Sequence, residues 1–389
     1  MLVFLLVACS PEVPDAGDAS ELDRFDADNG ALYSDLRDDG YDHVPGQYLV
    51  LFDRPGRVAR DIADVVPAAV ILQELETVPA AAVQMTHEDA VWLASQPHTR
   101  AVELDWLAEA TGKPTTAGCA TSSSQTVPPG VAMLGATTLT GAGVTVADID
   151  TGVDTAHPDV LAVGGADFTG SRTGYVDDNG HGTHTAGTIA ALNNAQGVIG
   201  VAPAASLYAV KVLDRRGSGS YSAIAGGIDW AVANGMDVAN LSLGGPADSA
   251  TLHASVTAAK NANVILVVAA GNEGGSATNS WPAAYDGEVI TVSAVSNSGA
   301  FASWSNYGVP PIDVAAPGVV VCSTTKGGAW GLMDGTSMAA PHVTGAVALY
   351  LERHPGAGFA EVEAAVKANV AALADTSRHT EDLAIVSGY

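Results

Sequence analysis

The sequence predicts an α/β fold, a mostly parallel sheet with helices on both faces in three layers, preceded by a small α+β unit. From residue 125 onward, strand-length runs rich in Val, Ile and Leu alternate with segments of helical periodicity, which is typical of βαβ units. A composition of 47% hydrophobic and 15% charged residues is that of a globular chain with a buried core. The length of 389 residues suggests two or three domains.

Composition also excludes several classes of function. The formal charge is −27, from 43 acidic and 16 basic residues, whereas nucleic acids and anionic membranes bind positively charged surfaces. We therefore expect no nucleic-acid partner. Three cysteines (Cys9, Cys119 and Cys322) are too few for a disulfide scaffold and lack the spacing of a metal site. No apolar run reaches the roughly 20 residues that span a bilayer.

The first nine residues, MLVFLLVAC, form a short apolar leader. Its end is similar to a bacterial lipoprotein signal, which is cut before a lipidated cysteine, here Cys9. An ordinary secretory signal or a misassigned start stays open, because no basic residue precedes the apolar run. We expect an exported bacterial protein, secreted or held at the cell surface. Residues 10–46 are dominated by Asp, Ala and Gly and predict a disordered acidic tether or unstructured leader.

Residues 47–108 predict the small α+β unit. Gln47–Phe52 and Ala81–Met85 have strand composition, and Thr86–Gln96 predicts a helix whose Thr86 and Asp89 have capping-box spacing. Residues 109–124 are a Gly/Thr/Ser-rich linker without periodicity, in which we expect proteolytic processing.

Residues 125–389 predict the larger body. The strand-length runs are Val144–Ile149, Leu207–Leu213, Val238–Leu243, Val264–Ala269 and Val289–Val295, and the clearest helices are Ala223–Asn234 and Ala250–Asn261. In parallel sheets of this kind, functional groups gather at the carboxyl ends of the strands.

Two polar motifs are ambiguous when taken singly. Asp148-Ile149-Asp150-Thr151-Gly152 ends the first strand; it predicts a turn or half of an aspartic protease dyad, but the sequence has no second such motif. In Asn179–Gly187, His181 and His184 are three residues apart, as in a helical metal pair, but no third ligand is evident.

A third motif, Asp334–His342, contains a serine at the predicted start of a helix. Gly335 permits a sharp turn, and Pro341 is tolerated only near a helix start. Ser337 is then placed where helix N–H groups stabilise a developing anion, although a plain N-cap is the alternative.

Together, these motifs resemble those of the subtilisin-like serine proteases, and the resemblance covers residues 125–389. It implies that Ser337 is the nucleophile, His181 the general base and Asp150 the carboxylate that orients the imidazole. Val268–Gly274 resembles the oxyanion-hole block of the family, so that Asn272 donates its amide to the oxyanion together with the backbone N–H of Ser337.

The resemblance also implies two segments that pair with an extended peptide substrate. They are Gly217, Ser218 and Gly219, and Ser242, Leu243, Gly244 and Gly245. Ser280, Trp281 and Pro282 align with a family segment near the primary pocket, where no cluster of Asp indicates basic substrates. We expect a broad preference for apolar or aromatic side chains.

A structural Ca²⁺ site is likewise implied by the resemblance, with a plain surface turn as the alternative. Its ligands would be the side chains of Gln125, Asp159 and Asn194 and the carbonyls of Leu192, Gln196 and Val198. An all-oxygen donor set suits Ca²⁺, which would stabilise the fold without taking part in bond cleavage.

Residues 47–108 resemble, more loosely, the inhibitory propeptide of this family. This implies a zymogen that is cut in the linker and inhibited by its own propeptide. Cys119 and Cys322 could form a disulfide or stay as free thiols.

The sequence thus predicts an exported, monomeric serine endopeptidase that acts on peptides and proteins through an acyl-enzyme intermediate. A narrow-specificity processing protease and a catalytically silent binding protein are the alternatives. The full set of Asp150, His181, Asn272 and Ser337 argues against the silent protein.

Overall fold

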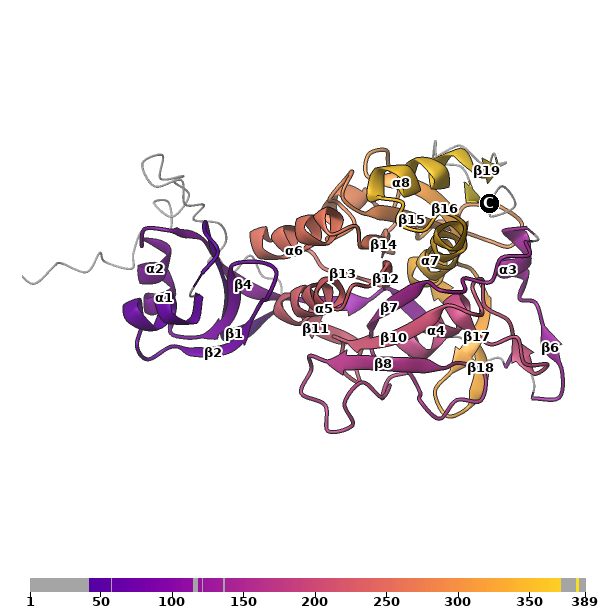
Figure 1. The fold of residues 1–389 in the computed structure, drawn as a ribbon, viewed down its shortest axis with the longest axis horizontal. Coiled ribbons are helices and arrows are strands. Elements are labelled where there is room, and N and C mark those ends of the chain that lie inside the picture. The colour runs from indigo at the N-terminus through magenta and orange to yellow at the C-terminus, as the bar shows by residue number, and fades with distance from the viewer. Residues whose placement is uncertain are drawn as a thin grey trace, which may run out of the picture.

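The computed structural model describes residues 42–56, 58–114, 118–120, 122–135, 137–371 and 383–384. The predicted leader with Cys9 and most of the predicted tether lie outside these residues. The chain forms a smaller N-terminal unit beside a larger α/β body (Figure 1). Within the described ranges, no helix has the length and apolar character needed to cross a membrane.

The N-terminal unit is an antiparallel sheet with two helices on its outer face (Figure 1). The strands are β1 (His43–Phe52), β2 (Val70–Glu74), β3 (Ala80–Gln84) and β4 (Thr99–Ala110), and the helices are α1 (Val58–Val65) and α2 (His87–Ala94). The predicted cap of α2 is present, since the backbone N–H of Asp89 donates to Thr86 Oγ1 at 3.1 Å. The predicted tether ends earlier than expected, because His43–Gly46 already belong to β1.

The larger body is built on a sheet whose parallel strands follow the order β16-β15-β14-β12-β7-β10-β8. Their bounds are β7 Thr145–Asp150, β8 Ala162–Asp167, β10 Ser206–Lys211, β12 Val238–Leu241, β14 Ile265–Ala269, β15 Ile290–Val295 and β16 Ile312–Pro317. Short strands β19 (Val370–Ala371) and β20 (Leu383–Ala384) extend one edge. The central strands are continuous apolar runs because helices cover both faces of the sheet. The predicted fold class is confirmed.

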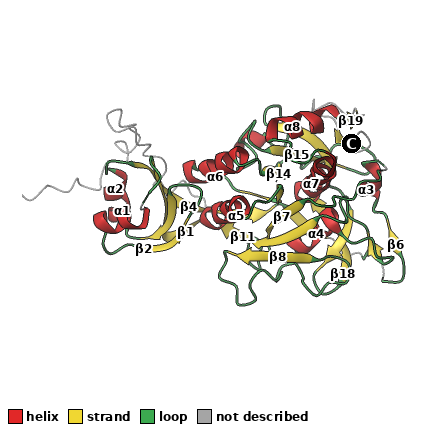
Figure 2. Cartoon of the chain, viewed as in Figure 1, coloured by secondary structure: helices red, strands yellow, loops and turns green. Residues whose placement is uncertain are grey.

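Helices form the two outer layers (Figures 1 and 2). On one side lie α4 (His181–Ala190) and α7 (Thr336–Arg353), with α8 (Phe359–Ala368) beside them. On the other side lie α5 (Tyr221–Ala233) and α6 (Ala250–Asn261), close to the predicted segments. Short α3 (Pro129–Met133) and a 3₁₀ turn at Ala277–Asn279 complete the described helices.

The remaining strands are short and lie around the sheet. They are β5 (Gly112–Pro114), β6 (Gln125–Thr126), β9 (Gly197–Val198), β11 (Ser218–Ser220), β13 (Leu243–Gly244), β17 (Val321–Thr325) and β18 (Ala329–Gly335). Cys119 and Cys322, on β17, form a disulfide with a Cα–Cα distance of 5.7 Å. Of the two states that the sequence left open, the structure contains the disulfide.

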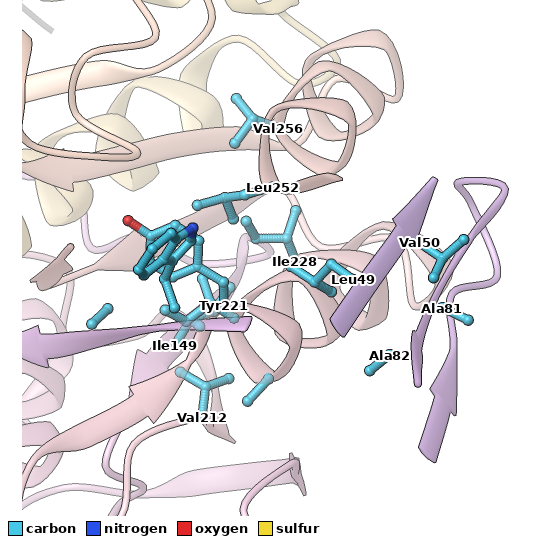
Figure 3. Packing of buried hydrophobic residues seen from close by; sticks show 14 of the residues in the cluster. Leu49, Val50, Ala81, Ala82, Ile149, Val212, Tyr221, Ile228, Leu252 and Val256 are labelled. Carbon is cyan, nitrogen blue, oxygen red and sulfur yellow. The ribbon is translucent and has the colours of Figure 1, made fainter. Parts of the chain in front are cut away.

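The N-terminal sheet packs against α5 and α6, and one hydrophobic cluster continues across the contact (Figure 3). Leu49 and Ala82 of the smaller unit belong to the same cluster as Ile228 and Leu252 of the larger body. Because the two units share this hydrophobic core, they pack in one specific arrangement and are not independent domains joined by a linker.

Two buried carboxylates complete this contact. Glu103 accepts hydrogen bonds from Ala250 N at 2.6 Å and Ser249 Oγ at 3.0 Å, at the start of α6. Asp105 accepts from Ser222 N at 2.9 Å, at the start of α5. The N-terminal unit therefore caps two helices of the larger body.

Candidate active site

Asp150 and His181 lie side by side at the carboxyl edge of the sheet. Asp150 ends β7 and His181 begins α4, and His181 Nδ1 lies 2.8 and 2.9 Å from the two carboxylate oxygens. Their side chains are 0% and 4% exposed, so the pair is almost free of solvent screening. Burial by itself would lower the pKa of His181, but the charge and hydrogen bond of Asp150 raise it, and the resulting pKa is above the ordinary 6.5.

A second carboxylate, Asp177, shapes the turn before α4. Its Oδ1 accepts hydrogen bonds from the backbone N–H groups of Asn179 and Gly180 at 2.9 and 2.8 Å, and its Oδ2 accepts from Thr183 N at 3.0 Å. Gly180 has φ of +119°, a conformation that favours glycine. The sequence reading missed Asp177; an acid shortly before a helix start was the available signal.

Ser337 lies in the first turn of α7, directly after β18. Its Oγ donates to the carbonyl oxygen of Ser242 at 2.9 Å and lies 2.6 Å from Thr111 Oγ1. Among the described residues, His181 Nε2 has no hydrogen-bond partner. The structure therefore contains the Asp150–His181 contact but holds the serine hydroxyl in another direction.

The chain's own residues 107–112 occupy the cleft. Strand β4 pairs antiparallel with β11 on one side, where Ser218 faces Glu109, and with β13 on the other, where Leu243 faces Ala110. Ala110 N donates to Gly217 O at 2.8 Å, and Thr111 N donates to Ser242 O at 3.3 Å. The two segments predicted to bind substrate thus both bind this stretch, except that Gly245 pairs with Trp281.

The peptide bond after Thr111 lies among the proposed catalytic groups. Asn272 donates its side-chain N–H to the carbonyl oxygen of Thr111. Gly112 follows, and a Cβ added to it would lie 2.7 Å from His181 Nε2, so only glycine fits beside the imidazole. The orientation of Asn272 is set by its Oδ1, which accepts from Thr336 N and Thr336 Oγ1, each at 3.0 Å.

The linker was predicted to lack regular structure, but in the structure residues 109–110 and 112–114 are strands. Residues Gly112–Pro114 form β5, which pairs with β18 so that Gly112 faces Gly335. These pairings use backbone groups only, and they leave no alternation of side chains from which a strand could be predicted. The sequence reading likewise missed Thr111 and Gly112 as cleft residues, because a Thr-Gly pair indicates only a turn.

A cavity of about 440 Å³ opens beside Thr111. Its lining includes Gly244, Asn272, Glu273 and Ser280. Ser280 is buried, and a Cβ at Gly244 would lie 2.9 Å from Ser280 Oγ, which places this hydroxyl against the glycine wall of the cavity.

The residues predicted to bind Ca²⁺ converge on one loop. Gln125 Nε2 donates to the carbonyl oxygens of Leu192 and Val198 at 2.6 and 3.0 Å. Asp159 Oδ2 accepts from Val198 N at 2.9 Å and from Trp330 Nε1 at 2.7 Å, whereas Asp159 Oδ1 is buried with no partner among the described residues.

The side chains of Asn194 and Gln196 lie at the same loop and donate to Pro158 O at 3.2 and 3.1 Å. No group of three or more His, Cys, Asp or Glu that could hold a metal is found in the part of the chain that the structure describes. Carbonyl and amide oxygens with one partly unpaired carboxylate fit a hard cation such as Ca²⁺ better than a transition metal.

His184 is separate from the cleft. It is buried, its Nε2 lies 3.0 Å from Val321 O, and burial together with the charge of His181 lowers its pKa to about 3. Each imidazole has its own partner, Asp150 for His181 and Val321 O for His184, and among the described residues neither belongs to a group of three possible metal ligands.

Comparison with known proteins agrees with this arrangement. The profile described as "Subtilase family" matches residues 141–384. A thermostable alkaline protease of Halalkalibacterium halodurans is 43% identical over 314 residues, which is 79% of this chain and 82% of that protein. A subtilisin of Bacillus pumilus is 51% identical over 241 residues, covering 60% of this chain and 87% of that one.

A solved structure of a cold-adapted subtilisin-like serine proteinase superposes with a TM-score of 0.60 at 35% identity. It covers 64% of this chain and 91% of that chain. With the family profile over more than half of the sequence and relatives of this identity, the assignment is direct: the chain is a serine endopeptidase of the subtilase family.

Proposed function

We propose that this chain is the precursor of an exported subtilase that first cuts its own Thr111–Gly112 bond and then hydrolyses other polypeptides. The observation that carries the proposal is the position of that bond. Its carbonyl accepts from Asn272, its amino side is paired with β11 and β13, and its carboxyl side is paired with β18 next to His181.

The proposed reaction begins when Ser337 Oγ turns from Ser242 O towards His181 Nε2. Its oxygen attacks the carbonyl carbon of Thr111 while His181 Nε2 takes the proton, and Asp150 stabilises the imidazolium. The developing oxyanion accepts hydrogen bonds from Asn272 and from Ser337 N–H. The C–N bond to Gly112 then breaks, and His181 gives its proton to the leaving nitrogen. Water, deprotonated by His181, finally hydrolyses the ester between Thr111 and Ser337.

Other substrates would bind as the chain's own residues do, as a strand between β11 and β13. Such pairing recognises the backbone and tolerates many sequences, which supports a broad protease over the narrow-specificity alternative. The expected preference for apolar or aromatic side chains stays a prediction. Because Ser280 narrows the cavity beside Thr111, Ser280→Gly should raise kcat/KM for substrates with Phe before the cut more than for those with Thr.

Calcium and export belong to the same proposal. We infer that a structural Ca²⁺ is held by Gln125, Asp159, Leu192, Asn194, Gln196 and Val198. The ion would connect Gln125, near the start of the mature body, to the loop at residues 192–198. Export rests on the apolar leader. Lipid attachment at Cys9 has no support from the relatives, and it stays a prediction from residues outside the described ranges.

Intact-mass analysis of the full-length chain tests the proposal, with wild type compared to Ser337→Ala. The expected result is a wild-type fragment ending at Thr111 and a second one beginning at Gly112, while Ser337→Ala stays full length. Ser298 is an exposed serine outside the proposed site, so the Ser298→Ala variant should be processed like wild type. If wild type cleaves unfolded casein but keeps the Thr111–Gly112 bond, self-processing at this bond is wrong.

A further inference from the structure

Asp148 is a second buried carboxyl group beneath the proposed triad. It precedes Asp150 by two residues on β7, so both side chains lie on the same face of the strand. Its side chain is buried and touches neither substrate nor the reacting atoms. Thr185 Oγ1, on α4, lies within hydrogen-bond distance of Asp148 Oδ2, at 2.9 Å, and Asn240 Nδ2, on β12, donates to Asp148 Oδ1 at 2.9 Å.

The contact with Asn240 continues to the nucleophile. The amide of Asn240 also donates to Ser242 Oγ at 3.0 Å, and Ser242 Oγ donates to the carbonyl oxygen of Ser337 at 2.9 Å. That carbonyl is free to accept because Pro341, four residues further along α7, has no N–H. Ser242 O in turn accepts from Ser337 Oγ, so Ser242 holds both ends of the nucleophile.

The orientation of the Asn240 amide depends on Asp148. Asn240 Oδ1 accepts from Thr344 Oγ1, on α7, at 3.0 Å, so the oxygen and both N–H groups of the amide each have a partner. An amide flip would present the amide oxygen, in place of the N–H group, to Asp148 Oδ1 and would remove this hydrogen bond. One carboxyl group is thereby linked to β7, to α4 and, through Asn240, to α7.

The surroundings of Asp148 favour its neutral form. Its neighbours on the adjacent strands are Ala209 and Asn240, neither of them charged. The negative charges of Asp150 and Asp177 act on it, and the imidazole of His181 is paired with Asp150 instead. Burial and these two charges raise the pKa of Asp148 well above its ordinary value. A proton on Oδ2 can be donated to Thr185 Oγ1, whose own hydrogen then reaches Gly182 O at 3.0 Å.

We propose that Asp148, as a neutral carboxylic acid, is a positioning residue that sets the relative placement of the three elements carrying Asp150, His181 and Ser337. This role goes beyond the proposed function and rests on the catalytic roles proposed there. A neutral group can supply these hydrogen bonds without adding a second negative charge to the Asp150–His181 pair.

The test compares Asp148→Asn and Asp148→Val in the processed enzyme, using kcat and KM for a peptide substrate between pH 5 and pH 10. An amide reproduces the neutral acid, accepting from Asn240 and donating to Thr185. Asp148→Asn should therefore keep kcat within about threefold and leave the acidic limb of the profile in place. Asp148→Val should lower kcat by about 10- to 100-fold with little change in KM, since small displacements of reacting groups cost this much.

Asp237→Asn is the matched control. Asp237 bonds Thr145 at the opposite end of β7, with both the N–H and the hydroxyl of Thr145 donating to Asp237 Oδ2 at 2.7 Å. It should lower the melting temperature and leave kcat unchanged. Full kcat in Asp148→Val overturns the proposal, and so does an acidic limb shifted downward in Asp148→Asn, which would mean that Asp148 is charged. If Asp148→Val does not fold, the pH profile of Asp148→Asn decides. Loss of activity in Ser337→Ala tests the triad separately.

Discussion

At the scale of single residues, the pKa of His181, which its surroundings set, determines the pH range in which the enzyme is active. A histidine must be neutral to act as a base, and Asp150 favours its charged form. Asp150 therefore orients the imidazole of His181, and it also keeps this imidazole protonated up to a higher pH than a free histidine.

The acidic limb of kcat/KM should have its midpoint above pH 6.5, because the pKa of His181 is raised. In Asp150→Asn, burial lowers the pKa of His181 and only the weaker effect of the Asp177 charge still raises it, so the limb of the residual activity should move to lower pH. Its kcat should fall by about 10,000-fold, as in triads that lose this carboxylate. An unchanged midpoint in Asp150→Asn would contradict the assigned cause.

Asn272 is the second residue whose effect can be predicted. Asn272→Ala should lower kcat by about 100- to 1000-fold with little change in KM, which is the size of this donor's effect in subtilisin. Steady-state kinetics on a short peptide measures it, with the exposed Asn297→Ala as control. A change confined to KM would instead assign Asn272 to ground-state binding.

At the scale of elements, the carboxylates that cap α5 and α6 make the stability of the contact between the two units depend on pH. Burial raises the pKa of Asp105 to about 6, although its bonds from Ser222 and Gln47 partly oppose this. Since the folded pKa lies above the unfolded value of 3.8, the docked form holds its proton more tightly. The contribution of Asp105 to stability is therefore greatest at low pH, and it decreases as the pH rises from about 4 to above 6.

Urea unfolding of full-length Ser337→Ala, with and without Asp105→Asn, measures this contribution. As the pH is raised from 4 to 7, the urea midpoint of the Asp105→Asn variant should rise relative to the midpoint of its parent. Glu109→Gln, on the same strand β4, is the control. A difference that is constant with pH would contradict the linkage.

The calcium loop is the second element with a measurable contribution. Removing Ca²⁺ with a chelator should lower the melting temperature of Ser337→Ala by about 10 °C, because a ligand at about 1000 times its Kd contributes about 4 kcal/mol. Asp159→Asn should melt at the same temperature with and without the chelator. A chelator effect of equal size in Asp159→Asn would show that the ion binds elsewhere.

At the scale of the whole molecule, the Cys119–Cys322 disulfide joins the linker to the strand pair that leads into Ser337. It spans 203 residues, and the bond stays intact when Thr111–Gly112 is cut. The new N-terminus is then only seven residues from an anchored cysteine, which keeps it attached near β17 and β18.

Replacing both cysteines by alanine in Ser337→Ala should lower the free energy of unfolding by up to about 5 kcal/mol, from the entropy of a loop of this length. Denaturant unfolding of the double variant measures it, and dithiothreitol should lower the parent to a similar value. Equal stability of all samples would mean that the thiols are free in solution.

Local pattern accounts for what could be predicted. The apolar runs of β7, β12 and β14, the cap of α2 and the glycine turn before Ser337 depend on neighbouring residues and were legible in the sequence. The order of the three polar motifs pointed to the family for the same reason. The cleft end of β4 (Glu109 and Ala110) and strand β5 were missed because their partners are backbone groups more than 100 residues away.

The sequence by itself determined the fold class, the family and the residue types of the site, since each follows from short motifs and periodicity. Only the tertiary structure decided which bond lies in the cleft, whether Cys119 pairs with Cys322, and what surrounds Asp148. These depend on contacts between segments far apart in the chain. The sequence around Asp148 would be the same for a charged carboxylate at a surface and for a neutral carboxyl group beneath the triad. Only its burial in the tertiary structure distinguishes these two states.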